Sequence, residues 1–403
     1  MFDLERIIVI GGSLAGLSAA RSLRESGFDD HLIVVEAGDS LPVDRPPLSK
    51  AVLTGEAMPQ DALVPGAEVV ESLDLDVRVH HGVEGFSAAD CRLKLFNDLE
   101  LDADAVVVAT GSAPRMLELA RGLENAFVLR DAHHAVALRN VLDGAPVRVV
   151  VGAGFIGLEV AASARSLGHQ VTVIESAPTV MARVLPAAVG DAIASLHRSR
   201  GVTILTGAAI NRLEAKNTTA ETVVLADGTR VPVDVLVIGI GAHPCVAWAE
   251  GSGLEIADGI VCDATCRASE RVWAAGDVAQ WYNPAYAASM RVEQWDNAVA
   301  MGEYVGKNLI AASQDRPIEP YVSIPWFWSD QYEHKLQMAG RPSAADELVW
   351  QFGGPGDDKF VVAFRDGDRC TAVLAMNRPR AAVLARMKME QSLDWDHVIG
   401  SPA

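Results

Sequence analysis

A chain of 403 residues is too long for one hydrophobic core, and 50% apolar with 22% charged residues is typical of a globular protein of two or three domains, which excludes a disordered or fibrous chain. A formal net charge of −19 would repel a phosphate backbone, so we expect no nucleic-acid partner. No apolar run approaches the about 20 residues of a membrane-spanning helix, and the chain enters a strand pattern at Arg6 without a leader segment. We therefore expect a cytoplasmic protein that does not cross a membrane.

A glycine-rich turn near the N-terminus predicts the first dinucleotide site. An apolar segment at 6–10 precedes the turn GGSLAG at 11–16, an alanine-rich helix pattern follows, and a second apolar segment ends at Glu36. Such a turn lets the backbone approach a pyrophosphate at the helix N-terminus, while the acid accepts hydrogen bonds from a ribose. Ser13 replaces the middle glycine of the usual fingerprint, so the prediction depends on strand, turn, helix and acid together. The alternative is a tight turn that binds nothing.

The same pattern returns in the middle of the chain and predicts the nicotinamide site. The turn GAGFIG at 152–157 follows the apolar segment 147–151, and the next apolar segment ends at Glu175. The carboxylate of Glu175 can accept both ribose hydroxyls of NADH, whereas the 2′-phosphate of NADPH would bring like charges together. We expect NADH, and the nearby Arg183 keeps NADPH open as the alternative.

Two complete patterns in one chain indicate two cofactors. Hydride transfer between a nicotinamide and a flavin is cofactor chemistry, and the protein must stack the two rings and exclude water. We therefore expect a tightly bound FAD at the first turn and an exchangeable NADH at the second.

Three further apolar segments and a change of composition predict the domain organisation. The segment from Ala105 breaks at Thr110 and Gly111, another begins at Asp234, and a third from Val272 indicates that the chain returns to its first domain. Beyond residue 320 the sequence becomes rich in aromatic strand patterns. The prediction is an α/β fold with an FAD-binding domain at 1–111 and 243–319, an NADH-binding domain at 112–242 and a C-terminal α+β domain at 320–403.

The five cysteines form no C-x-x-C pair and no zinc-binding pattern with histidines. Cys262 and Cys266, four residues apart, are candidate ligands, but isolated cysteines are usually buried apolar residues. We expect no metal site in this chain.

From Pro42 to Lys50 (PVDRPPLSK) the sequence resembles one group in particular, the FAD-dependent NADH:ferredoxin reductases of cytochrome P450 and Rieske-type oxygenase systems. The resemblance extends along the whole chain, because GGSLAG, DRPPLSK, ATGSAPR, GAGFIGLE, MARVLP, AAGDVA, VEQWDNA and PWFWSDQY occur in the family's order. It implies two Rossmann-like dinucleotide-binding domains of the glutathione-reductase-like kind, followed by a C-terminal α+β domain. Val43 and the run His243–Cys245 depart from the family pattern, which affects details at the adenine end and between domains.

The resemblance also implies roles for individual residues. Lys50 corresponds to a lysine near flavin N5 that pairs with the glutamate matching Glu159, where a cation would stabilise negative charge on reduced flavin. Trp295 corresponds to the residue that lines the isoalloxazine, and Asp277 to the aspartate that binds the ribityl chain. Each has an ordinary alternative: a surface lysine, an exposed helix glutamate, a core tryptophan and a helix N-cap.

The candidate catalytic residues are thus Lys50, Glu159 and Trp295. The expected FAD contacts are Gly11, Ser13, Ala15, Gly16, Glu36, Arg45, Pro46, Lys50, Val83, Thr110, Gly111, Arg130, Asp277 and Trp295. The expected NADH contacts are Gly152, Gly154, Phe155, Ile156, Gly157, Glu175, Arg183 and Gly241.

The predicted reaction takes hydride from NADH to FAD and then passes single electrons, through a semiquinone, to a 2Fe–2S ferredoxin that serves an oxygenase. The most basic stretch of the C-terminal segment, with Arg378, Arg380, Arg386 and Lys388, is the candidate docking patch, and a solvated helix face is the alternative. We expect a monomer or weak homodimer.

Two other functions remain open. A disulfide or peroxide reductase needs a reactive cysteine near the flavin, and residues 36–53, where such relatives carry one, contain none. A non-enzymatic NADH-sensing flavoprotein would turn over ferredoxin slowly and keep its flavin reduced for long periods.

Overall fold

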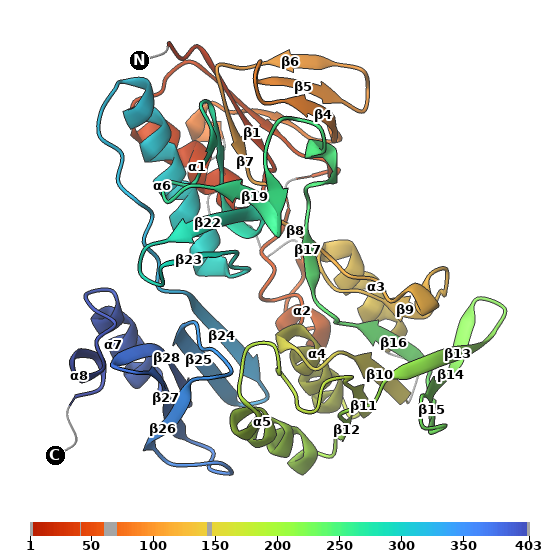
Figure 1. The fold of residues 1–403 in the computed structure, drawn as a ribbon. Coiled ribbons are helices and arrows are strands. Elements are labelled where there is room, and N and C mark those ends of the chain that lie inside the picture. The colour runs from red at the N-terminus through yellow and green to blue at the C-terminus, as the bar shows by residue number, and fades with distance from the viewer. Residues whose placement is uncertain (1–2, 41, 60–70, 143–146, 401–403) are drawn as a thin grey trace. The chain divides into compact units, whose positions relative to one another are not determined.

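The computed structural model describes residues 3–40, 42–59, 71–142 and 147–400 (Figure 1). The chain divides into two compact units, each built from separate stretches of sequence. Unit 1 comprises Met1–Asp44, Leu63–Ala113 and His243–Pro325, and unit 2 comprises Arg45–Ala62, Pro114–Ala242 and Trp326–Ala403. Among the described residues, no helix combines the length and the apolar character that crossing a bilayer requires.

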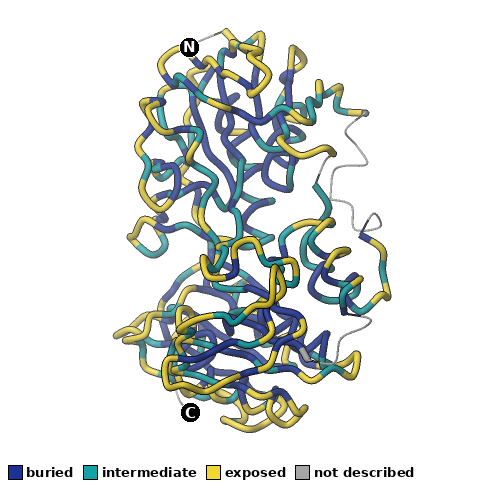
Figure 2. The backbone as a smooth tube through the Cα atoms, turned by 90° about the vertical axis from the view of Figure 1, so that its right-hand side faces the viewer, coloured by how far each residue is buried: buried dark blue, intermediate teal, exposed yellow. Residues whose placement is uncertain are grey.

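A six-stranded sheet is the centre of unit 1. Its order is β20-β21-β7-β1-β2-β3, and all neighbours run parallel except β20 and β21. The strands are β1 (Arg6–Ile10), β2 (His31–Val35), β3 (Asp76–Arg78), β7 (Ala105–Val108), β20 (Arg267–Ser269) and β21 (Val272–Ala274). Residues 7–10 of β1 and all of β7 are apolar and buried, as expected for strands covered on both faces of a sheet. Figure 2 shows the buried residues gathered in the interior, with exposed residues at the outer turns. The late strand β21 pairs with β7, so distant parts of the sequence build one sheet.

Two helices of unit 1 cross at very short range. They are α1 (Leu14–Glu25), which follows the first glycine turn, and α6 (Trp295–Ser313). A Cβ on Gly306 would lie 2.7 Å from the Cβ of Ser22, and a Cβ on Gly302 would lie 2.9 Å from that of Ser18. The hydroxyl of Ser22 donates to the carbonyl of Glu303 at 2.6 Å. Glycine at two positions of α6 therefore allows the two backbones to touch.

Short sheets and turns complete unit 1. The antiparallel sheet β4-β5-β6 is formed by β4 (Val83–Ser87), β5 (Arg92–Leu95) and β6 (Glu100–Asp102). The sheet β18-β19-β22-β23 is formed by β18 (Ile256–Ala257), β19 (Gly259–Cys262), β22 (Ala279–Asn283) and β23 (Ala288–Met290). The 3-10 turns are η3 (Glu71–Leu73), η5 (Ala247–Ala249) and η6 (Gly276–Val278). The strands β8 (Ser112–Pro114) and β17 (Ala242–Pro244) lie where the chain passes between the units.

Unit 2 contains a second parallel sheet, in the order β12-β11-β10-β16-β9. Its strands are β9 (Ala126–Phe127), β10 (Val147–Val151), β11 (Gln170–Ile174), β12 (Thr203–Leu205) and β16 (Val235–Ile238). The helices of this part are α2 (Ala51–Thr54), α3 (Ala132–Leu142), α4 (Phe155–Ser166) and α5 (Ala187–Ser199), with the turn η4 (Glu118–Ala120). A three-stranded antiparallel sheet is formed by β13 (Ile210–Lys216), β14 (Thr219–Leu225) and β15 (Arg230–Pro232).

The end of the chain forms a five-stranded antiparallel sheet in unit 2, in the order β24-β25-β28-β27-β26. The strands are β24 (Trp326–Gln331), β25 (His334–Gly340), β26 (Glu347–Phe352), β27 (Phe360–Asp366) and β28 (Arg369–Met376). Two helices follow, α7 (Pro379–Met389) and α8 (Trp395–Val398). Along β24 buried residues alternate with partly exposed ones, which is the period of a strand with one covered face. The predicted fold class, two Rossmann-like parallel sheets and a C-terminal α+β part, is confirmed, whereas the three domain boundaries stay a prediction.

Candidate functional site

The first glycine turn is a tight connection that excludes side chains. Gly11 has a φ of +105°, and a Cβ there would collide with the carbonyl oxygen of Ala109 at the end of β7. A Cβ on Gly16 would overlap the carbonyl oxygen of Gly11, so the start of α1 lies directly on the turn. Ser13, the N-cap residue of α1, makes no side-chain cap hydrogen bond to any described residue. The first amides of α1 are therefore available to an anion.

Glu36 is held beside this turn by both of its carboxylate oxygens. Oε2 accepts from the backbone N–H of Gly12 at 2.9 Å, and Oε1 accepts from that of Gly38 at 2.9 Å. Each oxygen keeps a second lone pair, so the carboxylate can also accept ribose hydroxyls. Anion-binding amides next to a fixed acid fit the adenosine diphosphate portion of a dinucleotide.

The second turn, in unit 2, repeats these contacts. Glu175 accepts from the backbone N–H of Ala153 at 2.8 Å with one oxygen and from that of Ala177 at 2.8 Å with the other. A Cβ on Gly157 would overlap the carbonyl oxygen of Gly152. A Cβ on Gly154 would meet no atom within 4 Å, which explains why the corresponding position of the first turn accepts serine. Both turns fit a dinucleotide.

Two more of the predicted NADH contacts lie together at this turn. The guanidinium of Arg183 donates to the carbonyl of Ile240 at 3.4 Å, next to Gly241. Ile156, in the first turn of α4, is 47% exposed. The ring of Phe155 contacts that of Phe327 on β24, with the ring centroids 4.2 Å apart. Phe327 was not among the predicted site residues.

The predicted pair of Lys50 and Glu159 is present. The ammonium Nζ of Lys50, which precedes α2, lies 2.8 Å from Oε2 of Glu159 on α4. That side chain is only 7% exposed, so Glu159 is not an exposed helix residue. The hydroxyl of Ser49 donates to the same oxygen at 2.5 Å, and the hydroxyl of Ser329 donates to Oε1 at 2.7 Å. A buried carboxylate thus has three donors, including one cation.

In unit 1, the predicted flavin contacts make polar interactions with neighbouring segments. Asp277, within η6, accepts from the hydroxyl of Ser112 at 2.8 Å and is not the N-cap of that turn. The indole N–H of Trp295, at the start of α6, donates to Asp44 at 2.8 Å. Thr110, which follows β7, donates from its hydroxyl to the carbonyl of Cys245 at 2.9 Å, and Val83 at the start of β4 is buried. Ala15 lies at the start of α1 and Gly111 just before β8. Arg45, Pro46, Lys50 and Arg130, which are also predicted flavin contacts, belong to unit 2.

A buried histidine is linked to the Lys50–Glu159 pair through the side chains of Gln331 and Ser329. His197 on α5 is fully buried, and its Nε2 lies 2.8 Å from Oε1 of Gln331 on β24. The hydroxyl of Tyr332 lies 3.1 Å from Nδ1 of the same ring. Burial lowers the pKa of His197 from 6.5 to about 4, because the charged form would lose its hydration. The imidazole is therefore neutral at physiological pH.

This pKa predicts acid sensitivity. Between pH 6.5 and about 4 the unfolded chain binds a proton at His197 that the folded chain does not, so folding stability is present above this window and is lost as the pH falls through it. Between pH 7 and pH 5 the loss is about 2 kcal/mol. Urea unfolding of the wild type and of His197→Gln at pH 7 and pH 5 measures this loss of unfolding free energy, which should be smaller in the variant. Equal pH dependence in the two proteins would contradict this assignment.

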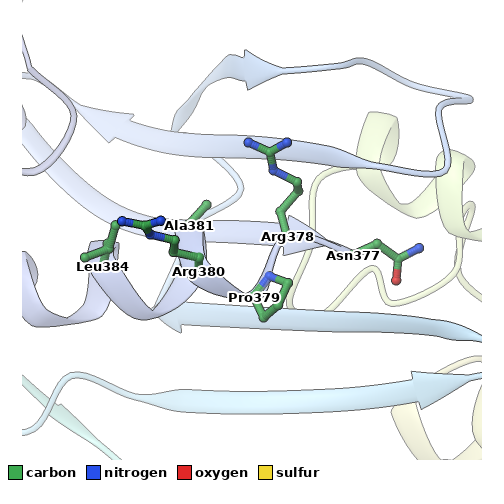
Figure 3. A pocket seen from close by; sticks show the side chains of 6 residues that line it. All are labelled: Asn377, Arg378, Pro379, Arg380, Ala381 and Leu384. Carbon is green, nitrogen blue, oxygen red and sulfur yellow. The ribbon is translucent and has the colours of Figure 1, made fainter.

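The four basic residues of the predicted docking patch differ in their surroundings. Arg386 pairs with Glu390 at 3.0 Å, and Lys388 donates to the carbonyl of Val398 at 2.9 Å. The guanidinium of Arg378 lies 4.0 Å from the ring centroid of Phe352, whereas the side chain of Arg380 makes no ion pair or hydrogen bond with any residue that the structure describes. An open hollow of about 410 Å³ at the start of α7 is lined by Asn377, Arg378, Pro379, Arg380, Ala381 and Leu384 (Figure 3).

Exposed apolar side chains accompany these cations on α7. Val383, Leu384 and Met387 are each between 45% and 54% exposed. Figure 3 shows Arg380 running along the helix beside Leu384, while Arg378 points toward a neighbouring strand. Cations around an apolar centre are typical of surfaces that bind proteins transiently.

Comparisons with known proteins agree along the whole chain. Residues 5–302 match the family described as pyridine nucleotide-disulphide oxidoreductase, and residues 326–398 match a reductase C-terminal domain. Rhodocoxin reductase of Rhodococcus erythropolis is 33% identical over 97% of this chain and 92% of its own. Putidaredoxin reductase of Pseudomonas putida is 32% identical over 98% of this chain and 95% of its own. A crystal structure of a covalent putidaredoxin reductase–putidaredoxin complex matches with a TM-score of 0.90 at 30% identity, covering 96% of this chain and 93% of that one.

Proposed function

The chain belongs to the pyridine nucleotide-disulphide oxidoreductase family, and within it we propose that this protein is an FAD-dependent NADH:ferredoxin reductase that supplies electrons to a cytochrome P450 or Rieske-type oxygenase. The observation that carries the proposal is the pair of equivalent glycine turns, each with a fixed glutamate, in a chain that matches ferredoxin reductases over nearly its full length. The protein uses FAD and NADH. One dinucleotide at each turn accounts for both.

The overall reaction balances with two molecules of a one-electron acceptor. One NADH and two oxidised ferredoxins give NAD⁺, one proton and two reduced ferredoxins. Bound FAD supplies the conversion, because it accepts hydride from NADH and releases electrons one at a time. The chain's own residues bind both dinucleotides, orient their rings and exclude water.

We assign the residues as follows. FAD is held at the turn of Gly11 and by Glu36, and NADH at the turn of Gly152 and by Glu175, with the remaining predicted contacts as given above. Lys50 places a cation where negative charge develops on reduction, and Glu159 orients it. The acceptor is a 2Fe–2S ferredoxin, the protein a monomer or weak homodimer, and its location cytoplasmic.

The cysteines support an iron–sulfur acceptor over a disulfide. All five cysteines are among the described residues, none of them forms a disulfide, and four of them are buried. Burial raises the pKa of Cys262 and Cys370 to about 12, and that of Cys91 and Cys266 above its usual value as well. A thiol must ionise to attack or to exchange with a disulfide, so these side chains do not serve as an electron relay.

Anaerobic reduction and selective reoxidation test the function. The purified yellow protein is mixed with NADH or with NADPH, and flavin absorbance is followed; we expect rapid bleaching with NADH and much slower bleaching with NADPH. The reduced protein is then offered 2Fe–2S ferredoxins, glutathione disulfide or hydrogen peroxide. Reoxidation by ferredoxin alone supports the proposal. Reoxidation by the disulfide or peroxide alone refutes it, and slow turnover with every acceptor would favour the NADH-sensing alternative.

Charge reversal at α7 tests the docking patch. Ferredoxins are usually acidic, so Arg378→Glu with Arg380→Glu should raise the KM for ferredoxin about tenfold and weaken its dependence on salt, while the rate of reduction by NADH stays unchanged. Arg121→Glu with Lys216→Glu is a control of equal charge change at two exposed residues outside α7. Equal effects of the two double variants would assign the change to net charge rather than to this patch.

A further inference from the structure

A continuous line of hydrogen bonds leads from the Lys50–Glu159 pair to α5. Oε1 of Glu159 accepts from the Ser329 hydroxyl at 2.7 Å, and Oγ of Ser329 accepts from the amide Nε2 of Gln331 at 3.1 Å. The carbonyl Oε1 of Gln331 lies 2.8 Å from Nε2 of His197, whose Nδ1 lies 3.1 Å from the Tyr332 hydroxyl. Glu159, Ser329, Gln331 and His197 are all buried, and all five residues belong to unit 2.

The donors in this line all point the same way. Because the amide of Gln331 donates to Ser329, its carbonyl faces His197 and requires Nε2 of the ring to carry the proton. Nδ1 is then the acceptor for Tyr332, which agrees with a neutral His197. Each group donates toward Glu159, so the line ends on an acceptor, as a carboxylate is. Aligned hydrogen bonds polarise one another and strengthen the last one.

The second carboxylate oxygen of Glu159, Oε2, is held in place as well. Its Oε2 accepts from Ser49 and contacts Lys50, and the carbonyl of Ser49 itself accepts from the Ser163 hydroxyl at 2.7 Å. The carboxylate therefore cannot rotate without breaking contacts on both oxygens. A buried carboxylate with one oxygen released would turn toward whichever donor remains, and its position relative to Lys50 would change.

We propose that Ser329, Gln331 and His197 are positioning residues that hold the Glu159 carboxylate against Lys50 and thereby set the placement of the Lys50 cation at the flavin. This inference rests on the proposed function, because it takes Lys50 as the cation beside the flavin. Ser329 acts directly on Glu159, and Gln331 and His197 act through Ser329. Ser329 and Gln331 lie on β24, within the segment 326–398 that matches the reductase C-terminal domain, whereas His197 lies on α5 in the segment 5–302. The C-terminal segment would therefore contribute to the placement of Lys50.

The midpoint potential of bound FAD in Ser329→Ala tests the proposal. It is measured by titration with dithionite and a reference dye, so neither NADH nor ferredoxin is needed and the result is independent of the proposed electron donor and acceptor. We expect a shift to a more negative potential, because a misplaced Lys50 stabilises reduced flavin less. The rate of reduction by NADH should fall about tenfold with little change in KM, as loss of one charge-assisted hydrogen bond implies.

Three variants separate positioning from general packing. Ser329→Thr, unlike Ser329→Ala, keeps a hydroxyl at this position and should have the wild-type potential. In a Glu159→Gln background, Ser329→Ala should cause no further shift, because the charge it acts upon is gone. Ser313→Ala removes another buried hydroxyl, which bonds within α6 in unit 1, and should leave the potential unchanged.

Gln331→Met, which nearly keeps the volume, provides a second measurement if Ser329→Ala fails to fold, and it should shift the potential in the same direction. An unchanged potential in the folded variants would overturn the inference, even if the thermal midpoint fell. A shift of equal size in the Glu159→Gln background would also overturn it. Failure of wild-type protein to reduce ferredoxin would instead count against the proposed function alone.

Discussion

Replacing Gly157 with alanine is expected to lower kcat/KM for NADH by about 100-fold, equivalent to about 2.7 kcal/mol, while one FAD remains bound per chain. The new Cβ would overlap the carbonyl oxygen of Gly152, so the start of α4 must move away from the turn. Overpacking of this kind costs about 1–3 kcal/mol by itself, and a displaced helix N-terminus also loses its contacts with the pyrophosphate. Stopped-flow reduction at a series of NADH concentrations gives the value.

Gly154→Ser is the matched control within the same turn. A Cβ at Gly154 meets no protein atom within 4 Å, and the first turn already carries Ser13 at this place. We expect kcat/KM to stay within about tenfold of the wild type, since the helix does not move. If Gly154→Ser were as damaging as Gly157→Ala, close packing of helix on turn would not be the reason that the two turns share the same geometry.

Lys50→Met should slow reduction of the flavin by NADH by about 100-fold and make the flavin potential more negative. The variant removes the cation that faces Glu159 and leaves a 7% exposed carboxylate with hydroxyl donors only. Loss of one partner of a buried pair is typically destabilising by about 3–5 kcal/mol, so stability must be measured alongside the rate. Single-turnover kinetics at saturating NADH separate this effect from NADH binding.

Lys50→Arg and the double variant Lys50→Met with Glu159→Gln serve as controls. Arginine keeps the charge and should retain most of the rate. The double variant removes the unpaired carboxylate, so it should regain stability without regaining the rate. A double variant as fast as the wild type would show that Lys50 stabilises the fold and does not act on the flavin.

The geometry of both dinucleotide turns could be predicted from the sequence because each turn is local. Strand, turn and helix follow one another within about twenty residues, and the glutamate ends the next strand. The unusual Ser13 did not obscure the first turn, since its backbone has an extended conformation that needs no glycine. The Lys50–Glu159 pair spans more than a hundred residues and was predictable only through the family resemblance.

The line of hydrogen bonds that ends at Glu159 could not be predicted, because its members come from three separate segments, α4, α5 and β24 with the residue after it. One signal for it is nevertheless present in the sequence. Phe327, Ser329 and Gln331 alternate along β24 and occupy its buried face. Two polar residues at buried positions of a strand require partners, because buried polar groups are almost always hydrogen-bonded. The pattern indicates that partners exist, but only the fold shows that they are Glu159 and His197.

The close crossing of α1 and α6 affects how the protein is made. During synthesis α1 emerges early, but its partner helix begins only at Trp295, after roughly three quarters of the chain has been translated. Until then the helix that starts at the first turn lacks the glycine-lined surface against which it packs. Contacts so distant in sequence form late in folding. Capture of the yellow cofactor should therefore follow the emergence of α6 from the ribosome, and shortened products that lack residues 295–313 should be colourless.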